Sequence, residues 1–150
     1  MCIRDSSYFH VPQLESQGAK LFYFGYSDFG VTAMEGGVVA NSDWLAKNRD
    51  LAVRFGRATA KAWQATRTNP AGAVDAAIKQ RPELAKTRDT HLRQLQMSLE
   101  SIATPNTQGW PMGRMSEKDW QKMVEQLVQS KQLPEAIPVD RLFTNEFIPQ

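Results

Sequence analysis

Cysteine and histidine are scarce in this sequence. The 150 residues contain one cysteine, Cys2, and two histidines, His10 and His91. One cysteine excludes a disulfide within the chain, and these three residues do not have the spacing of metal ligands. A catalytic cysteine–histidine pair is disfavoured too, because Cys2 lies in a terminal segment of the kind that is often poorly ordered. We therefore expect no metal and no other cofactor.

Long apolar runs and an excess of charge are also lacking. No stretch approaches the roughly 18 apolar residues of a membrane span, so we do not expect the chain to cross a membrane. The 18 basic and 16 acidic residues nearly balance. They alternate along the predicted helices as on solvated faces, which argues against nucleic-acid binding. Because Gly36–Gly37 is too short to cradle a phosphate and no carboxylate pair has a catalytic setting, we predict a protein that is not an enzyme.

The content of apolar residues, 41%, is that of a globular protein. Residues 1–6 lack the basic stretch and apolar run of a signal peptide. They also do not read as the start of a domain, and we expect them to be a leader foreign to the parent gene. In that case the missing signal peptide carries no information about location.

Two short strands are predicted in the first quarter of the chain. A short helix over 11–18 has Pro12 in its first turn and Gly18 as its stop. The aromatic run 19–26 favours a buried strand. Ser27 to Gly30 breaks it, and residues 36–40 form the second strand.

From residue 41 onward the pattern is helical. Asn41, Asn48 and Asn69 are predicted N-caps, and Ser116 with Asp119 resembles a capping box. A short helix is predicted to begin near residue 44. Further helices are predicted over 49–68, after Pro70, over 87–103 and over 117–129. A loop is predicted over 104–115 and a docked tail over 140–147.

Apolar spacing predicts which helix faces are buried. Residues at three- and four-residue intervals indicate the core face of the 49–68 helix: Leu51, Phe55, Ala58, Ala62 and Ala65. Three tryptophans on helices are expected in the core: Trp44, Trp63 and Trp120. Trp110 lies in a loop, where it either plugs the loop onto the core or stacks on a ligand.

Two short strands do not make a stable sheet by themselves. They need partner strands that these 150 residues do not supply. We therefore expect the chain to be a fragment of a larger α/β protein, with marginal stability and exposed apolar surface.

An ordered series of segments resembles one family. They are residues 8–18, 26–31, 38–48, 62–63, 69–70, 73–74 and 140–147. Together they resemble the C-terminal half of ABC-type solute-binding proteins, in the branch of alkanesulfonate, taurine, nitrate and thiamine-pyrimidine-precursor receptors. The resemblance covers about residues 7–149, and the order of the segments is more specific than any one of them.

The resemblance implies a fragment of a two-lobed type II periplasmic binding-protein fold, helix-rich with two or three short strands. Residues 7–30 would be the end of lobe two and the crossing between lobes, and residues 31–150 the return to lobe one with the C-terminal helices. The implied function is capture of a small organic solute by lobe closure, followed by docking on the membrane permease of an importer. The implied location is the periplasm, or a lipid anchor outside the cell membrane.

Six residues are candidates for ligand binding under this resemblance. Tyr8 and His10 correspond to cleft-lining positions at the end of a strand, although aromatic residues there also suit a core. Tyr26, Asp28, Phe29 and Gly30 correspond to the crossing, where Gly30 would allow unusual hinge angles. Asp28 either accepts a hydrogen bond from the ligand or caps a turn.

Two other functions stay open. The first is an enzyme of thiamine-pyrimidine synthesis, which the same fold family includes. The second is a small helical interaction protein whose helices over 49–68, 87–103 and 117–129 form a bundle. The second leaves the aromatic run 19–26 unexplained.

Overall fold

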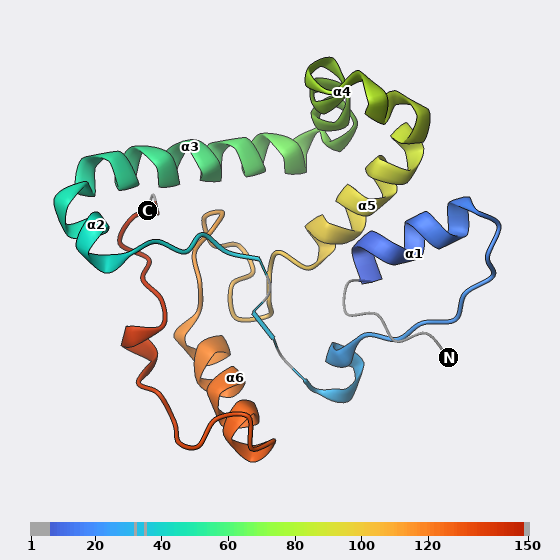
Figure 1. The fold of residues 1–150 in the computed structure, drawn as a ribbon. Coiled ribbons are helices and arrows are strands. Elements are labelled where there is room, and N and C mark those ends of the chain that lie inside the picture. Colours follow the sequence, from blue (N-terminus) through green and yellow to red (C-terminus); the bar gives the residue numbers. More distant parts are fainter. Residues whose placement is uncertain (1–6, 32, 35, 149–150) are drawn as a thin grey trace. The chain divides into compact units, whose positions relative to one another are not determined.

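The computed structural model describes residues 7–31, 33–34 and 36–148 (Figure 1). Within these ranges every regular element is helical. The α-helices are α1 (Ser7–Ser16), α2 (Ser42–Lys47), α3 (Arg49–Thr68), α4 (Pro70–Gln80), α5 (Arg88–Glu100) and α6 (Glu117–Gln129). Three 3-10 helices accompany them: η1 (Tyr26–Phe29), η2 (Pro82–Thr87) and η3 (Val139–Arg141). Cys2 and the predicted leader over residues 1–6 lie outside the described residues.

The strands predicted over 19–26 and 36–40 are absent from the described part of the chain, so the prediction of local α/β structure is wrong there. Residues 19–25 have no helix or strand, and η1 follows them. A strand needs a neighbour to take up its backbone hydrogen bonds. The aromatic pattern of residues 19–26 indicated a preference for burial, but the described residues contain no strand that could pair with them.

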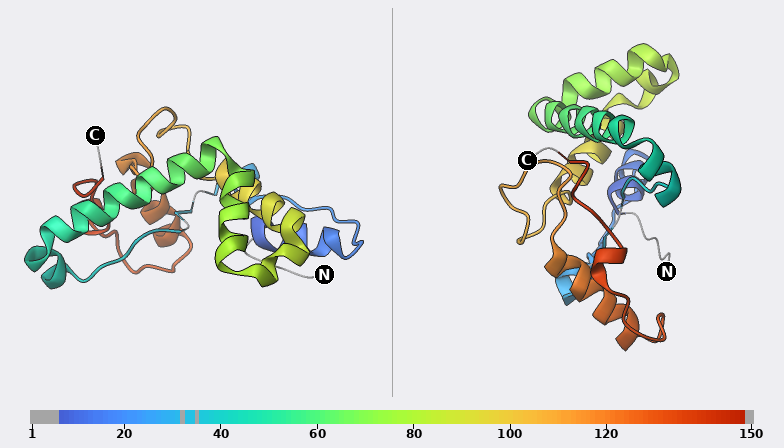
Figure 2. Two further views of the ribbon diagram at one scale, coloured as in Figure 1. Left: turned by 90° about the horizontal axis from the view of Figure 1, so that it is seen from above. Right: turned by 90° about the vertical axis from the view of Figure 1, so that its left-hand side faces the viewer.

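The chain divides into two compact units, each described here by itself. The first combines the chain up to Gly25 with Gln64–Ala103. In it α1 and α4 both pack on α5, as Figures 1 and 2 show. Val11 on α1 and Val74 on α4 are buried in this unit. The side-chain amide of Gln94 on α5 donates a 2.8 Å hydrogen bond to the carbonyl of Phe9, which links α5 to α1.

Helix ends in the first unit follow local sequence signals. Asn69 caps α4 by accepting a 2.9 Å hydrogen bond from the Gly72 amide, with Pro70 at the first helical position as predicted. Gly18 has φ +85°. The amides of Gly18 and Ala19 return to the carbonyls of Glu15 and Leu14, which is a Schellman closure and confirms Gly18 as the stop.

The start of α1 differs from its prediction. The helix begins at Ser7, so Pro12 lies inside it instead of in its first turn. Proline inside a helix removes one backbone donor. Val11 and Pro12 are nevertheless the buried residues of α1, and this helix packs against α5.

The second unit combines Tyr26–Trp63 with the chain from Thr104 onward. Asn41 caps α2 as predicted, accepting a 3.0 Å hydrogen bond from the Trp44 amide. Asn48 acts differently from its prediction. Its side chain donates to the Trp44 carbonyl at 2.9 Å, so that it closes the end of α2 and does not cap the start of α3.

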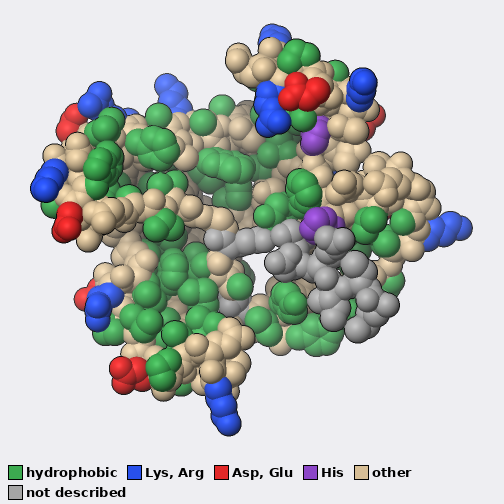
Figure 3. Space-filling view, viewed as in Figure 1, with side chains coloured by type: hydrophobic (Ala, Val, Ile, Leu, Met, Phe, Trp, Pro, Cys, Tyr) green, Lys and Arg blue, Asp and Glu red, His purple; other side chains and the backbone are tan. Residues whose placement is uncertain are grey.

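Helix α3 covers its predicted residues but buries a different face from the predicted one. Leu51 and Phe55 are exposed, Phe55 at 56%, whereas Ala52 and Gly56 are buried. The C-terminal tail explains the difference, because a Cβ at Gly56 would overlap the Phe147 carbonyl oxygen. Two expected core residues, Trp44 and Trp63, are exposed, and so is Trp110, which makes the plug interpretation wrong. Figure 3 shows hydrophobic side chains at the molecular surface.

Helix α6 places its predicted apolar stripe inward, with Val124 buried and Trp120 half-buried. The predicted capping box is wrong, because the Ser116 side chain makes no capping hydrogen bond. Asp119 instead accepts hydrogen bonds from the Thr104 hydroxyl at 2.6 Å and from the side-chain amide of Asn106 at 2.7 Å. Only 4% of Asp119 is exposed, so a buried carboxylate holds the loop that precedes α6.

The tail is docked as predicted. Phe143 stacks on Trp120 with ring centroids 5.5 Å apart. Asn145 makes two hydrogen bonds to the backbone of Met115, at 2.9 and 2.8 Å. Arg49 of α3 pairs with Glu146 and lies over the Phe147 ring.

Candidate functional site

The candidate crossing, Tyr26 to Gly30, is a single turn of 3-10 helix with a defined end. The Gly30 amide donates to the Ser27 carbonyl at 3.0 Å, and the Val31 amide donates to the Tyr26 carbonyl at 3.1 Å. These two bonds form a Schellman closure, in which the fifth residue has positive φ. Gly30 has φ +76°, so the unusual backbone angle expected of it is confirmed.

This turn is anchored to α6. The Gln126 side chain donates a 2.9 Å hydrogen bond to the Gly30 carbonyl. A little further along the chain, the Met34 amide donates to the Met123 sulfur at 3.4 Å. The backbone of the turn is therefore held by α6, while the side chains of Tyr26 and Phe29 are exposed. Four of the six predicted site residues lie on this one turn, and their role in binding stays a prediction.

Tyr8 and His10, the other two predicted site residues, lie within α1 and not at the end of a strand. Both are half-buried. The ring of His10 packs edge-on against Phe9, with centroids 5.1 Å apart. The local structure expected for this pair is thus wrong, whereas a ligand-binding role remains untested.

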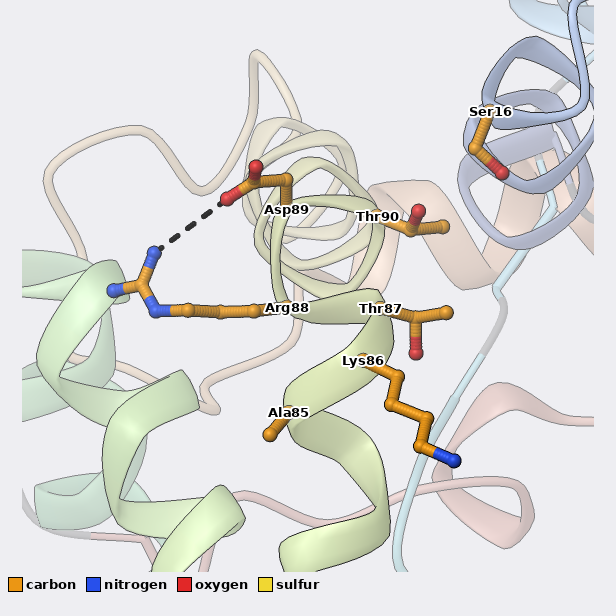
Figure 4. Close-up of a pocket in the computed structure, with 7 residues that line it drawn as sticks. All are labelled: Ser16, Ala85, Lys86, Thr87, Arg88, Asp89 and Thr90. Carbon is orange, nitrogen blue, oxygen red and sulfur yellow. Dashed lines mark ion pairs between the residues drawn. The ribbon is translucent and has the colours of Figure 1, made fainter.

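A cavity of about 360 Å³ lies in the first unit, where η2 meets α5 (Figure 4). Its lining comes from one residue of α1 and a continuous run at the junction: Ser16 and Ala85, Lys86, Thr87, Arg88, Asp89 and Thr90. Three hydroxyl groups and one ammonium group make this lining mainly polar. It can donate hydrogen bonds to a small polar molecule, but it has no apolar wall to enclose an organic one.

Arg88, beside this cavity, is already engaged with carboxylates. Its Nε lies 2.7 Å from Asp75 on α4, and a second nitrogen lies 3.7 Å from Asp89. The hydrogen bond from Arg88 lowers the pKa of Asp75, and the same bond raises the pKa of Arg88. The guanidinium therefore serves as a link between α4 and α5.

His91 connects the cavity to the α1–α5 contact. Its Nε2 lies 3.0 Å from the Thr87 hydroxyl, and its Nδ1 lies 3.0 Å from the Gln94 Oε1. Because the Gln94 amide nitrogen donates to the Phe9 carbonyl, the oxygen of that amide must accept. Nδ1 of His91 is therefore the donor to Gln94, while Nε2 forms the hydrogen bond with the Thr87 hydroxyl.

A smaller cavity of about 130 Å³ lies between α3 and the tail in the second unit. Val53, Arg57, Glu146, Phe147 and Ile148 line it. Beside it the hydrogen bond with Arg49 lowers the pKa of Glu146 and raises that of Arg49. Neither cavity contains a predicted site residue.

The sequence reasoning missed the larger cavity. A signal was present, because Thr87-Arg88-Asp89-Thr90 is a polar run between the Pro82 break and the first leucine of the next helix. Such a run is also an ordinary start of a helix, and pattern alone does not separate the two. Ser16 comes from a distant part of the sequence and has no signal of its own.

No group of histidine, cysteine, aspartate and glutamate side chains within the described residues could hold a metal ion. None of their helices combines the length and the apolar character needed to cross a bilayer.

Comparison with known proteins gives one match. The family described as NMT1/THI5 like matches residues 6–73. Residues 6–73 are a partial NMT1/THI5-like domain. This is a family of periplasmic binding proteins that includes sulfonate and nitrate binders. The predicted resemblance is therefore confirmed over residues 6–73, which are less than half of the chain. No curated protein and no solved structure matches the chain.

The NMT1/THI5-like segment contains all six predicted site residues, from Tyr8 to Gly30. It also contains α1, α2, nearly all of α3 and the start of α4. The family implies part of a type II binding-protein fold for these residues, although their described structure is helical.

Proposed function

We propose that this chain is part of the solute-binding component of an ABC importer. The observation that carries the proposal is the NMT1/THI5-like match over residues 6–73, which includes every candidate ligand-binding residue. The solute would be a sulfonate, a nitrate-like anion or a pyrimidine precursor, captured as two lobes close and then delivered to the membrane permease. A protein with this role would act in the periplasm, or from a lipid anchor outside the cell membrane.

Exposed apolar surface supports this proposal. Leu51 and Phe55 form an uncovered stripe on α3, and the aromatic residues before η1 are uncovered as well. Patches of this kind usually mark surfaces that another part of a protein or a partner covers. A two-lobed fold provides such a cover through the strands and helices that surround these segments.

The turn Tyr26 to Gly30 is the proposed ligand contact. Its backbone is fixed by the Gln126 bond, while Tyr26 and Phe29 extend to solvent. Exposed aromatic rings on a fixed turn can close over a small flat or anionic solute when a second surface approaches. Asp28 would select solutes that carry an amino group.

Titration calorimetry on the product of the complete reading frame tests the proposal, with taurine, an alkanesulfonate, nitrate and an aminopyrimidine as the solutes. We expect one solute to bind saturably. For a solute with an amino group, taurine or the aminopyrimidine, Asp28→Ala should weaken binding by about 1–3 kcal/mol, because a buried ligand donor loses its acceptor. Asp43→Ala, on α2, is the control and should leave binding unchanged.

Unchanged affinity together with lowered thermal stability in Asp28→Ala would show that Asp28 only caps a turn. The same experiment addresses the alternative, an enzyme of thiamine-pyrimidine synthesis, because the NMT1/THI5 family also includes enzymes. A receptor returns the bound solute unchanged after the protein is denatured, whereas an enzyme leaves an altered molecule. Absence of binding to all four solutes would contradict the proposal.

A further inference from the structure

The turn η1 is oriented by backbone contacts more than by side-chain packing. None of its four residues is buried, and Tyr26 and Phe29 are 59% and 71% exposed. The two bonds of its Schellman closure use the Gly30 and Val31 amides and leave the Gly30 carbonyl outside the closure. The closure fixes the internal shape of the turn, whereas its orientation on the protein depends on other contacts.

Helix α6 supplies two such contacts from adjacent positions of one face. The side-chain amide of Gln126 donates to the Gly30 carbonyl at 2.9 Å, and the Met123 sulfur accepts from the Met34 amide at 3.4 Å. Met123 and Gln126 are three residues apart, which places their side chains next to each other on a helix. One contact alone would let the segment pivot, whereas two contacts along the segment fix its direction as well as its position.

Helix α6 is itself firmly held. Val124 is 4% exposed, Asp119 accepts two hydrogen bonds from the preceding loop, and Phe143 stacks on Trp120. Well-packed elements position a site more precisely than irregular segments do. Because α6 lies outside residues 6–73, the NMT1/THI5-like segment does not contain the support of its own candidate turn.

We propose that Gln126 is a positioning residue for solute binding, which acts by orienting the turn Tyr26 to Gly30 and not by touching the solute. The inference rests on the proposed function, because it takes this turn as the ligand contact. A binding turn that is held in one orientation before the solute arrives loses less conformational freedom on binding. Removal of the Gln126 donor should therefore weaken binding, although the turn keeps all of its own side chains.

Titration calorimetry on the product of the complete reading frame tests the proposal with taurine, an alkanesulfonate, nitrate and an aminopyrimidine. Gln126→Met keeps the length of the side chain but removes the donor. It should raise the dissociation constant of the solute that binds by about fivefold. Gln126→Lys restores a long side chain with an N–H donor and should recover most of the affinity.

Gln121→Met is the matched control, because Gln121 is an exposed glutamine of α6 whose side-chain bond goes to Glu117 of the same helix. It should leave affinity unchanged. The NMR chemical shift of the Gly30 carbonyl carbon in the 150-residue chain gives a readout that needs no solute. It should move in Gln126→Met, return towards the parent value in Gln126→Lys and stay unaltered in Gln121→Met.

Unchanged affinity in Gln126→Met, with the parent still binding its solute, would overturn this inference and leave the proposed function standing. An unmoved Gly30 carbonyl shift would overturn it too. A loss of affinity that Gln126→Lys did not recover would assign Gln126 to general stability and not to positioning. Absence of binding of all four solutes to the parent would overturn both the inference and the proposed function.

Discussion

The irregular segments of the described residues fall into two groups, and the two groups are held in opposite ways. Residues 19–31, apart from the turn η1, and residues 36–40 carry exposed aromatic and aliphatic side chains. Residues 104–116 and the tail from 139 to 148 are equally irregular but are tied down by polar groups. Asp119 holds the loop, and Asn145 bonds to the backbone of Met115 in both directions. Irregular backbone thus stays in place where buried side chains satisfy it.

The difference is one of partners and not of apolar content. The tail contains Phe143, Phe147 and Ile148, which are as apolar as the side chains of residues 21–24. These residues are half-buried because Trp120, Arg49 and Gly56 provide surfaces for them. Leu21 and Phe22 are exposed despite their apolar side chains, so hydrophobicity alone does not bury a segment.

Asp119→Ala should have the largest effect on this comparison. It removes a buried carboxylate and leaves the Thr104 hydroxyl and the Asn106 amide without their acceptor. We expect a loss of about 3 kcal/mol in the free energy of unfolding, measured by urea titration with circular dichroism. The loop 104–107 should then lose its side-chain hydrogen bonds to α6.

Asp89→Ala provides the control, because this side chain is 99% exposed on the first turn of α5. Its replacement should not measurably change the unfolding curve. If Asp119→Ala behaved like Asp89→Ala, the loop would have to be held by its backbone bonds alone.

Gly56→Ala should break the docking of the tail. The added Cβ would overlap the carbonyl oxygen of Phe147 and lie 3.3 Å from its carbonyl carbon, both of them backbone atoms. Overpacking of this kind costs about 1–3 kcal/mol, which exceeds the gain of about 1 kcal/mol from alanine in a helix. We expect a net destabilisation, measured by urea titration.

The same substitution in a chain that ends at residue 139 sharpens the test. Without the tail the clash is absent, so Gly56→Ala should instead stabilise the chain by up to about 1 kcal/mol. The reversal of sign is the expected result. Equal destabilisation in both chains would show that Gly56 is needed for a reason other than the tail.

The sequence predicted where the helices lie better than which of their faces are buried. The limits of α3 and α6 agree with prediction, although the capping bonds predicted at Asn48 and Ser116 do not form. The face of α3 was not predictable in this way. Its apolar stripe through Leu51 and Phe55 competes with a second stripe through Ala52 and Gly56, and the tail packs closest where there is no side chain.

The candidate site was predictable only in part. Gly30 was recognisable because positive φ has a strong residue preference. The bond from Gln126 to the Gly30 carbonyl joins residues 96 positions apart, and no local pattern indicates it. The cavity beside α5 likewise depends on Ser16 meeting residues 85–90, which is a property of packing.

Lys131→Gly should show what a helix end closed by lysine costs in stability relative to one closed by glycine. Helix α1 closes at Gly18 and the turn η1 closes at Gly30, whereas α6 closes on Lys131, which has φ +59°. The amides of Lys131 and Gln132 return to the carbonyls of Val128 and Leu127, so the closure is again a Schellman motif. Glycine removes the steric cost of positive φ, and we expect a gain of about 1 kcal/mol in unfolding free energy.

Gln132→Gly is the matched control for this gain. Gln132 is adjacent but lacks positive φ, so glycine there adds only freedom to the unfolded chain. It should leave stability unchanged or lower it slightly in the same urea titration. A gain at position 132 equal to that at position 131 would mean that the backbone angle of Lys131 is not strained.

Glu146→Gln should have the smallest effect, and one that depends on pH. The hydrogen bond from Arg49 lowers the pKa of Glu146 in the folded chain. The stability that the carboxylate contributes is therefore present above the ordinary glutamate pKa of about 4.3 and is lost as the pH falls through the lower folded value. Melting temperatures of the parent and Glu146→Gln chains should differ slightly near neutral pH and converge in acid, and added salt should narrow the difference because both groups are exposed. Glu125→Gln, at an exposed position of α6, should show no such convergence. A difference that stayed constant from neutral to acid pH would mean that Glu146 holds the tail by packing and not by charge.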